Sequence, residues 1–387
     1  MNNWQKVKLK DVVSILGDGL HGTPTYDDSG EYFFINGNNL FSGKIKIKAD
    51  TKRINANEYL KYKKELNDRT LLVSINGTIG NVATYRGEKC ILGKSACYFN
   101  ILPEVCKGYI YYILLHDDFQ NYAKNWAAGT TIKNVSLKQM REYEFLLPSF
   151  EKQQQIVQIL SSLDDKIELN AQINHNLEEQ AKAIFREYFQ PHEKVVPLGS
   201  ICKCVLGGTP NRNKSEFWGG DIPWINSGKV NEFRITTASE YITDSGLKNS
   251  STKLLPCHTT VIAITGATLG QVSLLEIASC ANQSVVGVLQ NDNVPYTFIY
   301  PFIKENILEL ISNQTGGAQQ HINKQNVEAL PVPCYSPDLI SEYHEKISPL
   351  YGQISNNCFE SERLTGLRDL LLPKLMSGEI DVSEVEI

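Results

Sequence analysis

The sequence has no long hydrophobic run, no leader-like N-terminus and no paired cysteine motif. Its longest apolar stretch, around residues 109–115, is far shorter than the roughly 20 residues that cross a bilayer. The first ten residues, MNNWQKVKLK, lack the apolar centre of a secretory signal peptide. Nine cysteines, an odd number without a CxxC or HExxH motif, predict reduced thiols and no metal site. We therefore expect a cytoplasmic protein that contacts no membrane and holds no metal.

Catalytic motifs are also missing. The chain contains no Pro-Pro pair, so it lacks the Asn/Asp-Pro-Pro-aromatic motif with which adenine methyltransferases hold a flipped base. The glycine loops at residues 77–80 and 266–270 lack both the P-loop lysine and the GxGxxG spacing, and are predicted to be tight turns. We expect no catalytic residue in this chain.

The net charge of −5 is unevenly distributed. Residues 1–150 carry +5, residues 151–190 carry −3, residues 191–335 carry −1 and residues 336–387 carry −6. The first globular region is basic enough to permit phosphate contacts. The acidic segments are either solvated helix surface or a docking face for a basic partner.

Two segments carry the same helical pattern 187 residues apart, at residues 151–189 and 338–376. Apolar residues recur in both at alternating steps of four and three, which is the a/d spacing of a coiled coil. Asn170 and Asn357 interrupt the two seams at the same place, where polar residues fix register at a cost in stability. Because the segments enclose a globular region, we expect an antiparallel pair. The predicted seam contains Leu160, Leu163, Ile167, Asn170, Leu177, Ile347, Leu350, Ile354, Asn357 and Leu364.

The regions that precede the helices also resemble each other. Gly22-Thr23-Pro24 recurs as Gly208-Thr209-Pro210, and Phe34-Ile35-Asn36 recurs as Trp224-Ile225-Asn226. Glycines, prolines and apolar residues are shared, whereas the polar residues between them differ. Two copies of one scaffold with different specificities would show this pattern, and neutral drift on exposed surface is the open alternative. Strands are predicted at residues 32–35, 71–75 and 97–101, and one helix at residues 107–123.

These patterns predict an α/β (α+β) fold with pseudo-two-fold symmetry. Two repeated modules are separated by two long helices that form an antiparallel coiled coil. The predicted boundaries are 1–148 for the first module, 149–190 for the central helix, 191–336 for the second module, 337–378 for the C-terminal helix and 379–387 for a tail.

The helical segments carry a family resemblance. Residues 148–167, PSFEKQQQIVQILSSLDDKI, resemble the central region of type I restriction–modification specificity subunits, and residues 364–380, LTGLRDLLLPKLMSGEI, resemble their closing segment. The GTP openings and glycine loops fit the two target-recognition domains of that family. The likeness covers essentially the whole chain, and the helices are its most specific part.

The resemblance implies a non-catalytic, DNA-binding subunit. Each target-recognition domain would read one half of a bipartite DNA site, and the helices would set the gap and dock two methyltransferase subunits. The assembled complex would methylate adenine N6 with S-adenosylmethionine, and restriction or motor subunits would add ATP- and Mg-dependent cleavage. No cofactor would be bound by this chain itself.

Base reading requires Arg or Lys for guanine and Asn or Gln for adenine, and three places in each module offer such residues. The first place is the polar loop that follows the strand at Phe34 or Trp224. The second surrounds residues 94–95 or 282–284, and the third is the glycine-led loop at residues 129–134 or 317–324. Each place has a plain alternative: a solvated edge strand, a strand-end turn or a flexible turn. The candidates in the first module are Asn36, Asn38, Lys44, Lys46, Lys48, Lys94, Thr130, Thr131, Lys133 and Asn134. Those in the second are Asn226, Lys229, Gln283, Gln319, Gln320, His321, Asn323 and Lys324.

Two other functions compete with DNA recognition. A fused methyltransferase or nuclease would need a catalytic motif that the sequence lacks. A structural or glycan-binding adaptor, with paired β-rich modules on a coiled coil, would use exposed aromatic residues. We expect burial in the core to explain Trp126, Trp218, Trp224 and the tyrosine-rich helix more economically.

Overall fold

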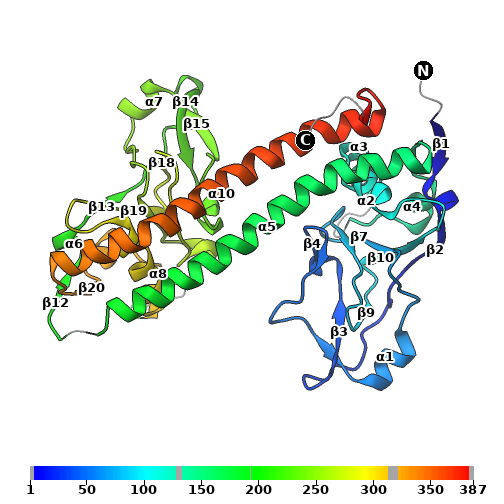
Figure 1. Ribbon diagram of the computed structural model, residues 1–387, viewed down its shortest axis with the longest axis horizontal. Coiled ribbons are helices and arrows are strands. Elements are labelled where there is room, and N and C mark those ends of the chain that lie inside the picture. Colours follow the sequence, from blue (N-terminus) through cyan, green and yellow to red (C-terminus); the bar gives the residue numbers. More distant parts are fainter. Residues whose placement is uncertain (1–3, 128–132, 192, 313–320, 383–387) are drawn as a thin grey trace. The chain divides into compact units, whose positions relative to one another are not determined.

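The computed structural model describes residues 4–127, 133–191, 193–312 and 321–382 (Figure 1). The chain forms two compact units. The first contains residues 1–165 and 365–387, and the second contains residues 166–364. Each unit holds one module together with a stretch of each long helix.

The two larger sheets of the first module share a core. Four strands lie in the order β2-β10-β7-β8, all antiparallel, and three lie in the order β6-β3-β9, with β3 and β9 parallel. The strands are β1 (Gln5–Lys8), β2 (Val13–Asp18), β3 (Tyr32–Ile35), β4 (Leu40–Phe41), β5 (Lys44–Ile45), β6 (Arg53–Ile54), β7 (Thr70–Ser74), β8 (Val82–Thr84), β9 (Cys90–Leu92), β10 (Ala96–Ile101) and β11 (Glu144–Leu147). The helices are η1 (Leu9–Val12), η2 (Gly37–Asn39), α1 (Ala56–Tyr62), α2 (Lys107–Leu115), α3 (Asp117–Trp126) and α4 (Leu137–Glu142).

The second module repeats these two sheets strand for strand, but its described residues contain no counterpart of the β4–β5 pair. Its sheets have the orders β13-β19-β16-β17 and β15-β14-β18, again with one parallel pair, β14 with β18. Its strands are β12 (Val195–Pro197), β13 (Lys203–Leu206), β14 (Trp218–Ile225), β15 (Glu240–Ile242), β16 (Thr260–Ala263), β17 (Val272–Leu274), β18 (Cys280–Ala281), β19 (Val285–Leu289) and β20 (Pro331–Pro333). Its helices are α6 (Leu198–Ile201), η3 (Ser215–Phe217), η4 (Ser227–Asn231), α7 (Asp244–Lys248), η5 (Gly266–Thr268), α8 (Tyr296–Ser312) and α9 (Lys324–Glu328). The predicted repeat of one mixed fold is confirmed.

The helix predicted over residues 107–123 is divided in two. His116 has extended backbone angles, ends α2 and begins α3, and its side chain accepts from the Asp118 N–H. Apolar spacing continues across this break, so periodicity alone predicted one helix. The predicted strands correspond to β3, β7 and β10.

Two long helices complete the units: α5 (Phe150–Tyr188) and α10 (Pro337–Ser377). Pro337 stands at the first position of α10, where its missing N–H costs nothing, and Gly378 follows the last turn with φ of +72°. In the first unit Lys152 of α5 pairs with Asp381, just after α10, and Asp164 pairs with Arg368. In the second unit Asn174 pairs with Asn357, and Tyr188 pairs with Glu342. These pairings make the helices antiparallel in each unit.

The largest core of the second unit joins the module to both helices. Phe185 of α5, Phe298 of α8 and Tyr343 of α10 are buried in one cluster, and α8 lies beside the long helices in Figure 1. Aromatic rings dominate this contact, so it removes a large apolar area from water. Within the described ranges, no helix combines the length and apolar composition needed to span a membrane.

The predicted seam is mixed in its burial. Leu160, Leu163, Asn170, Ile347, Ile354 and Asn357 are buried, whereas Ile167, Leu177, Leu350 and Leu364 are partly buried.

Candidate nucleic-acid interface

In the first module, the residue after β7 links two of the predicted places. The Ile75 N–H donates to the Ser95 carbonyl at 2.9 Å, and the Ile75 carbonyl accepts from the Val135 N–H at 2.9 Å. Lys94 and Lys133 are exposed neighbours of these anchored residues. The second and third places therefore lie side by side at the end of one buried strand.

The second module has the same arrangement after β16. The Ile264 N–H donates to the Ser284 carbonyl at 2.9 Å, and its carbonyl accepts from the Ile322 N–H at 3.1 Å. Gln283 and His321 are exposed beside these anchors. Because both modules use the same bonds, the juxtaposition belongs to the shared scaffold.

The first predicted place joins this cluster in the first module. Asn36 Oδ1 accepts from Ser95 Oγ at 3.0 Å, and Gly37 N–H donates to the same hydroxyl oxygen at 2.8 Å. The Asn36 N–H donates to Asn39 Oδ1 at 3.0 Å, and Asn39 is buried. Asn36 thus orders the turn, and the exposed Asn38 presents its side chain to solvent.

The corresponding place in the second module is held by backbone bonds. The Asn282 N–H donates to the Ile225 carbonyl at 3.0 Å, which sets Asn226 beside the cluster. Asn226 Oδ1 accepts from the Lys229 N–H at 3.2 Å, and Lys229 Nζ lies 2.8 Å from Glu232. The charge of Lys229 is therefore partly neutralised within the protein.

Three segments that are distant in sequence meet in each module. We call residues 36–38, 94–95 and 133–134 the first recognition edge, and residues 226–229, 283–284 and 321–324 the second recognition edge. Thr130, Thr131, Gln319 and Gln320 lie outside the described residues.

Part of the third place in the second module serves the fold. Asn323 Oδ1 accepts from the Asn326 N–H at 3.0 Å, which caps α9, and Lys324 lies 3.1 Å from Glu328. An Asn at a helix N-cap satisfies a backbone donor that would otherwise lack a partner.

Lys44, Lys46 and Lys48 do not share one strand face. The strand β5 ends at Ile45, and the Lys48 N–H donates to Thr51 Oγ1 where the chain turns. Lys46 and Lys48 are exposed, and Lys46 Nζ lies 5.6 Å from the exposed Phe41 ring. A strand of two residues cannot align three alternating side chains.

The glycine loops are tight turns, as predicted. Gly77 and Gly80 have φ of +74° and +94°, and Gly266 and Gly270 have φ of +70° and +82°. Glycine adopts these angles without the steric cost that a side chain imposes. Each loop follows the strand whose end anchors a recognition edge, so its turn shapes that edge.

Sequence reasoning missed four residues that adjoin the edges. Two residues after each GTP segment stand Tyr26 and Arg212, and both are exposed. Lys52 lies by Tyr26, with Nζ 5.9 Å from the ring centroid, and Glu240 accepts two hydrogen bonds from Arg212. The fixed distance from the GTP repeat was the signal for Tyr26 and Arg212. Nothing in the sequence indicated that Tyr26 lies by Lys52 or that Arg212 pairs with Glu240.

A buried charge cluster fixes the second module to the helices of its unit. The Arg234 side chain is 1% exposed, 3.6 Å from Glu178 of α5 and 3.5 Å from Glu276. Arg234 Nη1 also donates to Tyr300 Oη at 2.9 Å. Burial alone would lower the pKa of Arg234, but Tyr300, Tyr351 and the two carboxylates outweigh it and raise the pKa. The guanidinium is therefore charged inside the core.

Glu178 is held ionised by its neighbours in the same cluster. Burial raises its pKa, but Arg234 and Lys304 lower it by more, so the net pKa lies below the usual 4.5. Lys304 Nζ donates to Glu178 at 2.9 Å. Such a cluster costs desolvation energy yet strongly penalises the loss of any one member.

A polar layer crosses the helix pair in the second unit. Asn357 Nδ2 donates to Asn174 Oδ1 at 2.8 Å, and Asn170 Nδ2 donates to Glu360 at 2.7 Å. Asn170 Oδ1 is buried without a hydrogen-bond partner. Beside this layer lies a cavity of about 710 Å³, lined by Lys166, Thr236, Thr237, Gln353, Asn356, Asn357, Phe359, Glu360, Glu362 and Arg363.

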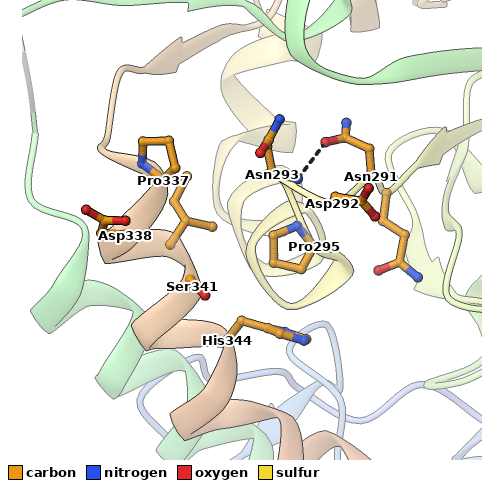
Figure 2. Close-up of a pocket in the computed structure, with 10 residues that line it drawn as sticks. Asn291, Asp292, Asn293, Pro295, Pro337, Asp338, Ser341 and His344 are labelled. Carbon is orange, nitrogen blue, oxygen red and sulfur yellow. Dashed lines mark hydrogen bonds between the residues drawn. The ribbon is translucent and has the colours of Figure 1, made fainter.

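A second cavity, of about 590 Å³, lies between the start of α8 and the start of α10 (Figure 2). His344 and Ser341 of α10 face the loop 291–295, where the Asn293 N–H donates to Asn291 Oδ1 at 3.0 Å. His344 Nδ1 lies 2.9 Å from Thr297 Oγ1, and burial lowers the pKa of this histidine. None of the predicted DNA-binding residues lines this cavity.

The cysteines are free thiols, and five of the nine are buried. All nine are unpaired with one another, and burial raises the pKa of Cys90 to about 12. A thiol with such a pKa is poorly reactive near neutral pH. Among the residues that the structure describes, no three His, Cys, Asp or Glu side chains are grouped to hold a metal ion.

Comparisons with known proteins agree on one family. Its sequence model, described as "Type I restriction modification DNA specificity domain", matches residues 1–179 and 192–342. The Type I restriction enzyme HindI specificity subunit of Haemophilus influenzae is 24% identical over 364 residues, covering 72% of this chain and 78% of the relative. The Type I restriction enzyme MjaIX specificity subunit of Methanocaldococcus jannaschii is 25% identical over 342 residues, covering 82% and 78%.

A solved structure is similar in fold. The crystal structure of a type I restriction–modification S subunit from M. genitalium matches with a TM-score of 0.59. The alignment covers 97% of this chain and 96% of that chain at 19% sequence identity.

Proposed function

Because this chain belongs to the type I restriction–modification DNA specificity family, we propose that it is the DNA-recognition subunit of a type I complex and reads a bipartite site. One observation carries the proposal. Two modules with the same two main sheets present different polar side chains at equivalent positions: Lys94 against Gln283, and Asn134 against His321. A shared scaffold with divergent exposed donors suits the reading of two different half-sites.

Each recognition edge would enter the groove of one half-site. Lysine side chains such as Lys94 and Lys133 suit guanine or phosphate, and Asn38, Asn134 and Gln283 suit adenine. Thr130, Thr131, Gln319 and Gln320 adjoin the edges in sequence and belong to the same proposal. The first module is basic and the second is not, so the isolated chain would bind DNA weakly and its partners would supply much of the phosphate contact.

The chain itself would be non-catalytic. Two methyltransferase subunits would dock on α5 and α10, which carry exposed apolar side chains at Leu169, Phe359, Leu367 and Leu370. The assembled complex would methylate adenine N6. S-adenosylmethionine would be bound by the methyltransferase subunits, and ATP and magnesium by restriction subunits where these are present.

The test is methylation profiling of host DNA by long-read sequencing, with this gene intact and then deleted. We expect N6-methyladenine at one split motif in the intact strain and its complete loss after deletion. Complementation with the intact gene serves as the control and should restore the motif. Unchanged methylation in the deletion strain, with the partner subunits expressed, would refute the proposal.

A further inference from the structure

Arg212 and Glu240 form a fixed pair on the exposed surface of the second module. Glu240 accepts from Arg212 Nη1 at 2.5 Å and from Nη2 at 2.8 Å. The guanidinium carbon lies 3.7 Å from the Trp218 ring centroid and 5.0 Å from that of Trp224. Although two hydrogen bonds and two rings restrain them, the side chains are 49% and 42% exposed. They are therefore held in place and still accessible to a ligand.

The rings under Arg212 are themselves anchored. Trp224 is buried and donates through Nε1 to the Gly208 carbonyl at 3.1 Å, and Trp218 donates to the Asn211 carbonyl at 3.3 Å. Their planes are nearly perpendicular, with centroids 5.3 Å apart. A planar guanidinium stacked on a fixed ring loses little further side-chain freedom on binding, which favours a selective contact.

The pair adjoins the second recognition edge. Thr209 Oγ1 donates to Gln283 Oε1 at 2.5 Å, so the GTP segment that leads to Arg212 touches an edge residue. The Asn226 N–H donates to Ser239 Oγ at 3.2 Å, and Ser239 immediately precedes Glu240. Both members of the pair are thus connected to the edge by direct hydrogen bonds of neighbouring residues.

The first module has a different pair at the equivalent positions. Tyr26 occupies the place of Arg212, and its ring lies 6.1 Å from Phe34, the counterpart of Trp224. Glu240 lies opposite Trp224 in the β14–β15 pairing, and Lys52 lies opposite Phe34, whose N–H donates to the Lys52 carbonyl at 2.9 Å. An aromatic–cation pair in one module therefore replaces a cation–anion pair in the other. The backbone arrangement is the same in the two modules here, whereas the exposed side chains differ.

The remaining hydrogen-bonding capacity of Arg212 and Glu240 matches one kind of base pair. Arginine has five N–H donors and a carboxylate has about four acceptor positions, so each keeps unused groups after two mutual bonds. In the major groove, guanine presents the acceptors O6 and N7, and its paired cytosine presents an amino donor. An arginine and a carboxylate side by side complement that pattern. An A·T pair also presents acceptors and an amino donor, but neither of its bases has the two adjacent acceptors that a guanidinium contacts on guanine.

We propose that Arg212 and Glu240 together read one G·C base pair in the half-site addressed by the second module, Arg212 contacting guanine and Glu240 contacting cytosine. This assignment rests on the proposed function. It makes the two residues specificity determinants rather than general phosphate contacts, and it predicts that both act at the same position of the target.

The test uses the complex of this chain with its methyltransferase subunits. Methylation rates are measured on duplexes that carry each of the four base pairs, in turn, at every position of the motif methylated by the wild type. We expect Arg212→Ala to reduce discrimination at one G·C position by about 5- to 150-fold, the selectivity of one good bidentate contact. Glu240→Gln should reduce discrimination at that same position. The double variant, Arg212→Ala with Glu240→Gln, should lose little more discrimination than Arg212→Ala alone.

Two variants separate base reading from charge and folding. Arg212→Lys keeps the charge but loses the planar fork, so it should retain binding while losing selectivity at the G·C position. Lys248→Ala removes one positive charge from an exposed helix of the same module and should leave the selectivity profile unchanged. Thermal unfolding and size-exclusion chromatography of each complex identify a variant that fails to fold or assemble.

The outcomes distinguish this inference from the proposed function. If the wild-type complex methylates no split motif, the proposed function and this inference are both refuted. If it methylates a split motif and the Arg212 and Glu240 variants keep the wild-type profile, this inference alone is overturned. A uniform loss at all positions, changes at two different positions, or a target without a G·C pair in the affected half-site would overturn it as well.

Discussion

Asn170 and Asn357 occupy the same position in the two helical repeats, and they meet each other: Asn170 Nδ2 lies 3.5 Å from the Asn357 carbonyl oxygen. Both side chains are buried. Contact between repeat-equivalent residues is what two antiparallel copies of one helix produce when they cross at their matched positions. The polar layer around these residues therefore marks the crossing point and defines the register of the pair in the second unit.

The polar layer gives the first prediction. Asn357→Ala should lower the free energy of unfolding by about 1–3 kcal/mol, because Asn174 Oδ1 would lose its buried donor. Urea denaturation followed by circular dichroism measures the change. Asn356→Ala, at the neighbouring exposed position, is the matched control and should have little effect. Equal destabilisation by the two variants would contradict the role assigned to the layer.

The apolar seam gives the second prediction. Leu163 of α5 is 2% exposed, whereas Leu169 of the same helix is 48% exposed. Leu163→Ala should cost about 2–5 kcal/mol of folding free energy, because it leaves a cavity in the seam. Leu169→Ala removes the same atoms from a surface position and should cost far less. Differential scanning calorimetry of both variants makes the comparison, and a Leu163 effect no larger than that of Leu169 would refute it.

The buried charge cluster gives the third prediction. Arg234→Ala should lower the free energy of unfolding by about 3–5 kcal/mol, since Glu178 and Glu276 would remain buried without their guanidinium. Arg186→Ala breaks an exposed pair with Glu305 in the same unit and should cost only about 0–1 kcal/mol. Chemical denaturation of the two variants tests the difference. Similar losses of unfolding free energy in the two variants would mean that burial does not make the loss of an ion pair more costly.

The fourth prediction concerns acid. Because the pKa of Glu178 lies below 4.5 in the folded chain, its stabilising effect is complete above pH 4.5. As the pH falls below that value, the unfolded chain binds the proton first, and stability is lost progressively down to the folded pKa. The Tm of the wild type should therefore fall more steeply than that of Glu178→Gln between about pH 5 and pH 3. Glu187→Gln, at an exposed site on the same helix, should follow the wild type.

Much of the fold follows from patterns that act locally. The a/d spacing predicted both long helices, and short apolar runs between turn residues predicted β3, β7 and β10, because burial of one face imposes a period on the sequence. The division at His116 escaped prediction since the apolar spacing runs through it and only the backbone angles and cap reveal it.

The candidate site was harder to predict because its residues come from separate segments, and the register of the strands decides which of these segments meet. The separate places containing Lys94 and Lys133 meet only through the bonds of Ile75, which no local pattern encodes. The pairing of Arg212 with Glu240 likewise depends on the turn after the GTP segment and on β14 lying against β15. Lys44, Lys46 and Lys48 looked regular in sequence, yet their strand ends after two residues.

The exposure of the Arg212–Glu240 and Tyr26–Lys52 pairs has a consequence for evolution. Surface ion pairs and exposed side chains contribute little to folding free energy, so substitutions there are nearly neutral for stability. The anchors beneath them, Trp224 and Phe34, are buried and would be costly to change. With the base-reading role proposed for these pairs, a lineage would alter which sequence a module prefers through a few surface substitutions, while selection on the core preserves the scaffold that presents them.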